Sequence, residues 1–244
     1  MRERSLAVLA ERGSGDGTLV ELVLRHELQH TETMRQAMAL ADRLPFGEPP
    51  AGPTGGRPGW VAVRGGTFSM GAAEGGFAYD NERPRHGVFV PTFEIARRPV
   101  TNAEWRAWVE GAGRDDRSTA STGHPDAPVC HVSWYDADAF ARAKGARLPT
   151  EAEWERAQAA GVLDDTGYVW EWTSSCFVGY PGFMAHPYRE YSEVFFGDRY
   201  RVLRGGSWAT DRRVATPTFR NWDLPERRQI FSGVRLARDA GGCA

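Results

Sequence analysis

The chain has 244 residues, of which 41% are hydrophobic and 25% charged, and its formal net charge is -2. These ordinary values leave no basic block for nucleic acid and no polybasic patch for a membrane surface. No segment approaches the roughly 20 consecutive apolar residues of a membrane span, and residues 1–12 are too charged for a signal peptide. We therefore expect neither a nucleic acid nor a membrane as partner.

Residues 18–44 are predicted to form one long helix. Thr18 to Glu21 reads as a capping box after the breaker at 15–17, and Pro45 ends the helix. His26 and His30 fall within an apolar stripe of helical spacing, so both imidazoles are expected to point inward. The other members of the stripe are Leu19, Leu22, Val23, Met34, Ala37, Ala41 and Leu44. Residues 2–12 are compatible with a preceding antiparallel helix.

The composition changes after this helix. Residues 47–59 hold four prolines and a glycine pair, which is typical of an extended linker. Residues 60–63 and 67–70 alternate like a hairpin around Gly65 and Gly66, and two more short strands follow at 88–90 and 93–95.

Three short helices are then expected, each with its own cap at Thr101, Ser133 and Thr150. From Tyr168 onward the pattern predicts little regular structure. Nine tryptophans and 28 glycines fit a loop-rich domain packed by large rings. Three scattered cysteines without a C-x-x-C pair argue against a disulfide scaffold or a thiolate zinc site, and they favour a reducing cytoplasm.

His26 and His30 belong to an H-E-x-x-H string. Imidazoles at i and i+4 lie one turn apart on one helix face, so both can bind one metal ion. Zinc hydrolases share this string but also need a third downstream ligand and a sheet edge for the peptide. A proline- and glycine-rich linker follows instead, so a zinc hydrolase is the weaker alternative. Two hydrogen-bonded histidines in a helical interface are another interpretation.

The string at 25–32 resembles the last-helix motif of the DinB-like bundle in EgtB-type sulfoxide synthases, the hercynine oxygenases of the ergothioneine pathway. The resemblance implies a non-haem Fe(II) site that contains His26 and His30, with a third histidine from an earlier helix. Neutral imidazole ligands suit iron(II) and leave positions open for substrates.

The rest of the chain looks like a formylglycine-generating-enzyme (sulfatase-modifying factor) domain. The implied fold class is α+β, with a C-type-lectin-related domain rich in irregular structure at 60–240, a linker at 47–59 and a remnant of the bundle at 1–46. Residues 77–82 and 221–223, and the lack of a closely spaced C-terminal cysteine pair, favour the sulfoxide-synthase branch. The matching segments are 65–71, 77–84, 99–102, 132–137, 147–155, 170–173, 204–208, 220–223 and 233–235.

By the same resemblance, Gln29 would hydrogen-bond the substrate imidazole, and Asn221 and Trp222 would line the trimethylhistidine pocket. Asp223 and Arg227 would hold the amino-acid end of the thiol substrate as a charged clamp. An aromatic pocket also attracts a quaternary ammonium by cation–π interaction.

The family uses a tyrosine as proton donor, which delivers a proton without introducing a charge. Tyr188 and Tyr191 are the candidates, with Tyr180 behind them. The implied reaction joins cysteine or γ-glutamylcysteine to C2 of hercynine as a sulfoxide, with Fe(II) as cofactor and O2 as co-substrate.

Two departures from the family keep alternatives open. The earlier bundle helices and their histidine are absent, and the segments at 114–128 and 161–167 are shorter than in relatives. We expect the third ligand to come from His86, His124, His131 or His186, or from a second polypeptide; otherwise the chain is a catalytically incomplete paralogue that binds substrate. His131 has the features of a core or turn residue.

Overall fold

The computed structural model describes residues 2–41, 51–113, 118, 120 and 122–241. The expected helix end at Leu44 and Pro45, and the linker residues 47–50, lie outside this range. The helices are α1 (Arg2–Arg12), α2 (Thr18–Leu40), α3 (Asn102–Ala112), α4 (Trp134–Ala143) and α5 (Glu151–Ala159), with short 3-10 turns η1 (Asp80–Glu82) and η3 (Glu193–Phe195). No helix within these ranges is long and apolar enough to cross a membrane.

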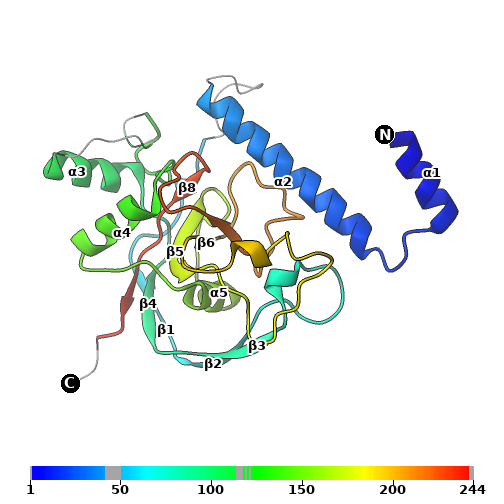
Figure 1. Cartoon of the computed structure of the whole chain (residues 1–244). Coiled ribbons are helices and arrows are strands. Elements are labelled where there is room, and N and C mark those ends of the chain that lie inside the picture. The colour runs from blue at the N-terminus through cyan, green and yellow to red at the C-terminus, as the bar shows by residue number, and fades with distance from the viewer. Residues whose placement is uncertain (1, 42–50, 114–117, 119, 121, 242–244) are drawn as a thin grey trace.

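Short strands form three small sheets, and α2 lies along one side of them with α1 standing apart (Figure 1). The sheet orders are β1-β4-β9, β2-β3 and β7-β6-β5-β8. The strands are β1 (Trp60–Val63), β2 (Gly66–Met70), β3 (His86–Val90), β4 (Phe93–Ala96), β5 (Trp170–Cys176), β6 (Arg201–Arg204), β7 (Asn221–Asp223), β8 (Ser232–Gly233) and β9 (Ala237–Asp239).

The predicted hairpin between β1 and β2 is wrong. The strands exist, but β1 pairs antiparallel with β4 and β2 pairs with β3. Between them, Gly65 packs tightly against the backbone of Pro91 and Thr92, where a Cβ would come within 2.5 Å of the Thr92 nitrogen. This close crossing sends the two strands into different sheets, and local alternation carries no information about such a distant partner.

The caps of the three short helices are confirmed. Thr101 and Thr150 each accept a hydrogen bond from a backbone N–H three residues on, and the glutamates there return it. Ser133 caps α4 in the same way. The capping box at Thr18 is wrong, because Gly17 takes the cap position at φ 81° and Asp16 accepts from the Thr18 N–H at 2.9 Å.

The chain after Tyr168 is more regular than predicted, since β5, β6, β7 and β8 form a four-stranded sheet. The first four residues of β5 are all buried and include Glu171, so the strand lacks the alternation that signals a half-buried strand. Strand β8 has only two residues. Neither β5 nor β8 could therefore be predicted as a strand from its own residues.

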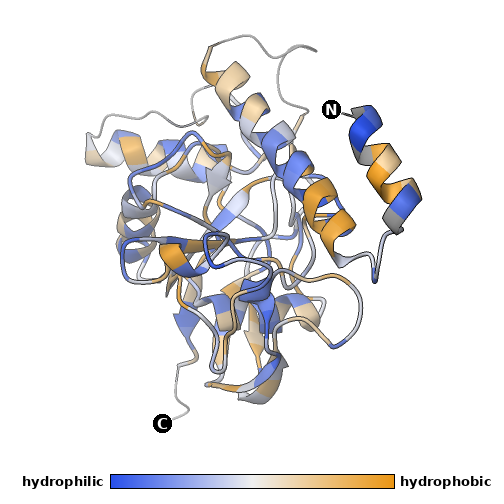
Figure 2. Cartoon of the chain, turned by 45° about the vertical axis from the view of Figure 1, so that its right-hand side comes forward, coloured by the Kyte–Doolittle hydropathy of each residue, from blue (hydrophilic) through white to orange (hydrophobic). Residues whose placement is uncertain are grey.

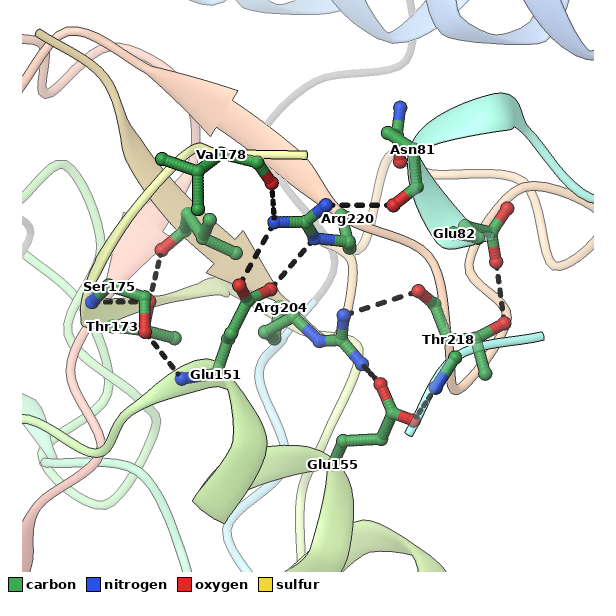
Figure 3. A network of polar contacts seen from close by, with 12 residues as sticks. Asn81, Glu82, Glu151, Glu155, Thr173, Ser175, Val178, Arg204, Thr218 and Arg220 are labelled. Carbon is green, nitrogen blue, oxygen red and sulfur yellow. Dashed lines mark hydrogen bonds and ion pairs between the residues drawn. The ribbon is translucent and has the colours of Figure 1, made fainter. Parts of the chain in front are cut away.

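Buried ion pairs connect α5 to this sheet (Figure 3). The fully buried Arg220 donates to both carboxylate oxygens of Glu151 at 2.8 and 2.9 Å, and also to the carbonyls of Asn81 and Val178. The buried Arg204 donates to Glu155 at 2.5 Å. Burying charged groups is costly unless they are paired, as both arginines are here, although the buried Nε of Arg204 has no hydrogen-bond partner among the described residues. Arg220 directly precedes β7, so this network fixes the start of that strand.

Helix α2 contacts the domain through polar residues and Leu22, while most of its apolar stripe faces away. Glu32 and Leu22 are its buried residues, and Arg25 and Arg35 donate to the carbonyls of Arg213 and Ala209. Most of its other apolar side chains are exposed, including Leu19 at 64% and Val23 at 55%. The ribbon of the N-terminal turns of the helix is coloured as hydrophobic in Figure 2.

Neither His26 nor His30 points into the core as expected, because both side chains are exposed. His26 nevertheless lines a cavity between the helix and the domain, which is described below. The stripe exists at the predicted spacing, but periodicity alone cannot say which partner covers it. On a helix with 3.6 residues per turn, the two histidines lie at the border between the domain-facing side and the apolar side.

Candidate functional site

A cavity of about 430 Å³ lies between α2 and the sheet that contains β5 and β7. Eight of the predicted site residues line it although they are far apart in sequence: His26, Gln29, Tyr188, Tyr191, Asn221, Trp222, Asp223 and Arg227. The other lining residues are Glu32, Thr33, Gln36, Trp170, Glu190, Phe195, Val214, Phe219 and Ile230. His30 and Tyr180 are the predicted residues that this cavity does not include.

The two histidines of α2 lie one turn apart, with ring centroids 4.5 Å from each other. Two neutral imidazoles at this spacing fit two positions of one metal ion. Among the described residues, no group of three or more His, Cys, Asp or Glu side chains is placed to hold a metal. The donor set on α2 therefore fits iron but is incomplete.

The other histidines lie elsewhere. The His131 ring, at a left-handed backbone φ of 63°, contacts the Arg228 carbonyl at 3.2 Å, and burial lowers its pKa. This agrees with its expected role as a core or turn residue. His86 contacts the Pro84 carbonyl and packs on Tyr180. Neither these residues nor His124 and His186 line the cavity.

An aromatic wall forms the side of the cavity opposite α2. The Trp222 ring stacks on Phe177 with centroids 4.1 Å apart and an interplanar angle of 7°. Tyr191 approaches the same indole edge-on at 6.2 Å, and Phe195 lies tilted against it at 5.6 Å. These contacts hold the indole in one orientation and leave part of its surface in the cavity.

Tyr191 is buried and connects this wall to α2. Gln29 Nε2 donates to the Tyr191 hydroxyl at 3.4 Å, and the ring stacks on Tyr79 at 4.9 Å. Burial raises the pKa of Tyr191 well above its usual value and that of Tyr79 to about 12. Tyr188 lies edge-on to Tyr191 at 6.3 Å and is 45% exposed at the cavity.

Tyr180 is placed differently. It is buried outside the cavity, its ring lies 4.2 Å from the Arg220 guanidinium, and burial raises its pKa. Its hydroxyl has no hydrogen-bond partner in the described part of the chain. The structure therefore separates Tyr180 from the other two tyrosines.

Asp223 and Arg227 face the cavity as a pair. Arg227 Nε lies 3.6 Å from Asp223 Oδ2, and Asp223 Oδ1 accepts from the Leu224 N–H at 2.7 Å. Burial raises the pKa of Asp223, against the opposing effect of Arg227. A carboxylate and a guanidinium side by side can bind an ammonium and a carboxylate group of one ligand.

The loop that carries Tyr188 and Tyr191 is anchored from η1. Ser192 Oγ donates to the Asp80 carboxylate and accepts from Asn81 Nδ2 at 3.0 Å. All three side chains are buried. This anchor fixes the backbone immediately after Tyr191.

Sequence reasoning missed Glu32 and Trp170 as lining residues. Their side chains are hydrogen-bonded at 2.7 Å across 138 residues of sequence. Glu32 lies in the same motif as the histidines, so its position on the helix could have indicated that it lines the cavity. No local pattern marks Trp170 as its partner.

The chain matches the family described as sulfatase-modifying factor enzyme 1-like domain over residues 45–166 and 156–240. It is 38% identical to the hercynine oxygenase of Mycolicibacterium smegmatis, with 89% of this chain and 71% of the relative covered. It is 37% identical to the hercynine oxygenase of Mycobacterium tuberculosis, with 96% and 74% covered.

The chain belongs to the hercynine oxygenase family. It is therefore an oxidoreductase of the ergothioneine pathway with a formylglycine-generating-enzyme-like domain, as the resemblance implied. The matches run over 304 and 317 residues, more than the 244 of the whole chain, so these relatives carry additional residues within the matched region.

Solved structures agree on the fold. The structure of PvdO from Pseudomonas aeruginosa is similar with a TM-score of 0.61 at 20% identity, covering 74% of this chain and 94% of that one. The predicted α+β class with much irregular chain is confirmed.

Proposed function

We propose that this member of the family uses Fe(II) and O2 to join a thiol, cysteine or γ-glutamylcysteine, to C2 of the hercynine imidazole as a sulfoxide. The observation that supports this most is the convergence of eight expected residues on one cavity. They come from α2, from the loop before η3 and from the chain at β7, and a zinc hydrolase would not require them together.

The iron would be held by His26 and His30, and when bound it would supply the site at which O2 and both substrates meet. Two ligands hold a metal weakly, and no group of three or more His, Cys, Asp or Glu side chains within the described ranges would complete the site. We propose that a second polypeptide, or helices supplied in trans, provides the third histidine.

Hercynine would bind with its trimethylammonium group against the Trp222 ring and near Asn221. A good cation–π contact contributes about 0.5–2 kcal/mol. Gln29 lies next to the histidines along α2, so its side-chain amide would hydrogen-bond the substrate imidazole and orient C2 toward the metal. Asp223 and Arg227 would hold the ammonium and carboxylate groups of the thiol.

Tyr188 is the better candidate for the proton donor. Its ring lines the cavity and is 45% exposed, so a bound substrate can reach the hydroxyl. Tyr191 is buried, already accepts the Gln29 hydrogen bond and packs between Tyr79 and Trp222. We therefore assign proton delivery to Tyr188 and support of Gln29 to Tyr191.

The experiment is anaerobic loading with Fe(II), hercynine and each thiol, followed by oxygen and mass spectrometry. The proposal predicts a sulfoxide whose amount depends on Fe(II), and much less of it from His26→Ala. A bundle fragment from a relative, added in trans, should raise the yield. Absence of any sulfoxide with the fragment present would exclude this reaction for the chain.

A binding subunit without catalysis is the second candidate, favoured by the incomplete donor set among the described residues. Calorimetry would then show hercynine binding that is the same with and without Fe(II) and in His26→Ala. A zinc hydrolase is disfavoured, because Glu27, the general base of such a motif, does not line the cavity.

A further inference from the structure

Glu32 is a buried carboxylate on α2 that receives three hydrogen bonds from the domain. Its Oε1 accepts from Trp170 Nε1 at 2.7 Å and from Ser207 Oγ at 2.6 Å, and its Oε2 accepts from Thr210 Oγ1 at 2.7 Å. The side chain is 5% exposed, and all three donors are neutral. The donors come from β5 and from the loop that follows β6.

These bonds differ from the other polar contacts of α2. Arg25 and Arg35 each donate to one backbone carbonyl of the domain, and Arg25 also lies over the Phe77 ring, whereas Glu32 is buried and hydrogen-bonded to the domain at both carboxylate oxygens. Hydrogen bonds are directional, so a one-residue shift of the helix, which turns it by about 100°, would break all three. Leaving Trp170 Nε1 and Ser207 buried without an acceptor would then add a desolvation cost.

The bonds also connect the two walls of the cavity. Gln29 and His26 precede Glu32 on α2 by one and two turns, and both line the cavity. Trp170, the donor on the domain side, lines it as well. The position of α2 at Glu32 therefore sets how far Gln29 and His26 lie from the Trp222 side.

We propose that Glu32 is a positioning residue: through hydrogen bonding rather than charge, it fixes the register and rotation of α2 and so sets the geometry in which Gln29 and His26 face the substrate. The identity of that substrate as hercynine rests on the function proposed above. The role of Glu32 in fixing the register of α2 does not depend on that function.

A matched set of variants separates hydrogen bonding from charge. In Glu32→Gln the amide oxygen can still accept from Trp170 and Ser207. The amide nitrogen can donate to Thr210 Oγ1, whose own proton can turn toward Ser207 Oγ at 3.1 Å. Glu32→Ala removes every bond. In case Glu32→Ala does not fold, Thr210→Val removes one of the three bonds to Glu32, together with the contacts of Thr210 Oγ1 to the Ser207 N–H and Oγ.

The test is amide hydrogen exchange along α2 in the iron-free protein, combined with calorimetric titration of hercynine. We expect exchange at residues 25–36 and the hercynine Kd to rise about tenfold or more in Glu32→Ala. Glu32→Gln should stay within about threefold of wild type, and Thr210→Val should fall between. Arg35→Ala, which loses a single hydrogen bond of the same helix to the Ala209 carbonyl, is the control and should change neither readout by more than about twofold.

Two results would overturn the inference. If Glu32→Gln is impaired as much as Glu32→Ala, the charge matters and Glu32 acts as a ligand or an acid–base group. If Glu32→Ala exchanges like wild type, α2 does not depend on this carboxylate. Should wild type fail to bind hercynine, the proposed substrate is wrong, while the exchange comparison still decides whether Glu32 fixes the helix.

Discussion

At the residue scale, the cavity combines an aromatic surface, an amide and a charged pair, each held by its own neighbours. Trp222 is stacked on Phe177, and Gln29 is bonded to Tyr191. Such supported side chains keep their positions before a ligand arrives, so less of the binding free energy is lost in ordering them. Four residues that line the cavity therefore permit sharp tests.

Trp222→Leu should weaken hercynine binding while leaving the fold intact. The change keeps an apolar side chain against Phe177 but removes the ring face that attracts a quaternary ammonium. We expect the Kd to rise about five- to thirtyfold, measured by calorimetry. Histidine, which lacks the trimethylammonium group, is the control ligand, and its affinity should change much less. Equal losses for both ligands would contradict a cation–π role.

Tyr188→Phe and Tyr191→Phe should have different effects. Tyr188→Phe should lower sulfoxide formation about 10²-fold or more with hercynine affinity nearly unchanged, because only the proton donor is lost. Tyr191→Phe removes the acceptor of the Gln29 hydrogen bond and should instead raise the hercynine Kd. Steady-state kinetics together with calorimetry distinguish the two. The opposite pattern would transfer the donor role to Tyr191.

Asp223 should make folding less favourable as pH rises. Its pKa is raised from 3.8 by burial, so the folded protein binds its proton more tightly than the unfolded chain. Ionising the buried carboxyl destabilises the folded protein. This loss of stability is absent below pH 3.8 and complete above the raised pKa. Asp223→Asn should therefore raise Tm by about 1–3 °C at pH 7 but not at pH 3, and weaken thiol binding. The same Tm difference between Asp223→Asn and the wild type at pH 3 and at pH 7 would contradict this.

At the element scale, α2 has one side that contacts the domain, through polar residues and Leu22, and an apolar side that does not. Leu22 belongs to the core, whereas its neighbour Val23 is 55% exposed. The helix, its spacing and most of the short caps could be predicted from sequence because they depend on residues within one or two turns. Its orientation could not, because Glu32 binds groups 138–178 residues away.

Leu22→Ala and Val23→Ala form a matched pair that tests this orientation. Leu22→Ala should lower the free energy of unfolding by about 2–3 kcal/mol, because it leaves a cavity in the core. Val23→Ala should change it by less than about 0.5 kcal/mol, because the side chain is already in water. Denaturant titration of both variants measures the difference. The reverse order would mean that the side of α2 that carries Val23 faces the domain.

At the scale of the whole molecule, separate parts of the chain meet at one cavity. The resemblance in sequence predicted eight of its lining residues, since family motifs carry roles that periodicity does not. It misplaced Tyr180, because position in a loop does not reveal whether a side chain turns toward Arg220 or toward the cavity. Likewise β5 and β8 were missed, because pairing in a sheet depends on partners far away in the chain.

In the proposed metal site, His26 and His30 would share the metal ion with a ligand from a second polypeptide. The most direct test of the proposed site is hercynine affinity, measured by calorimetry with and without Fe(II) under anaerobic conditions. We expect Fe(II) to tighten hercynine binding to the wild type and to have no effect on its binding to His26→Ala. A hercynine affinity that is the same with and without Fe(II) and in His26→Ala, or no binding at all, would contradict the proposed site.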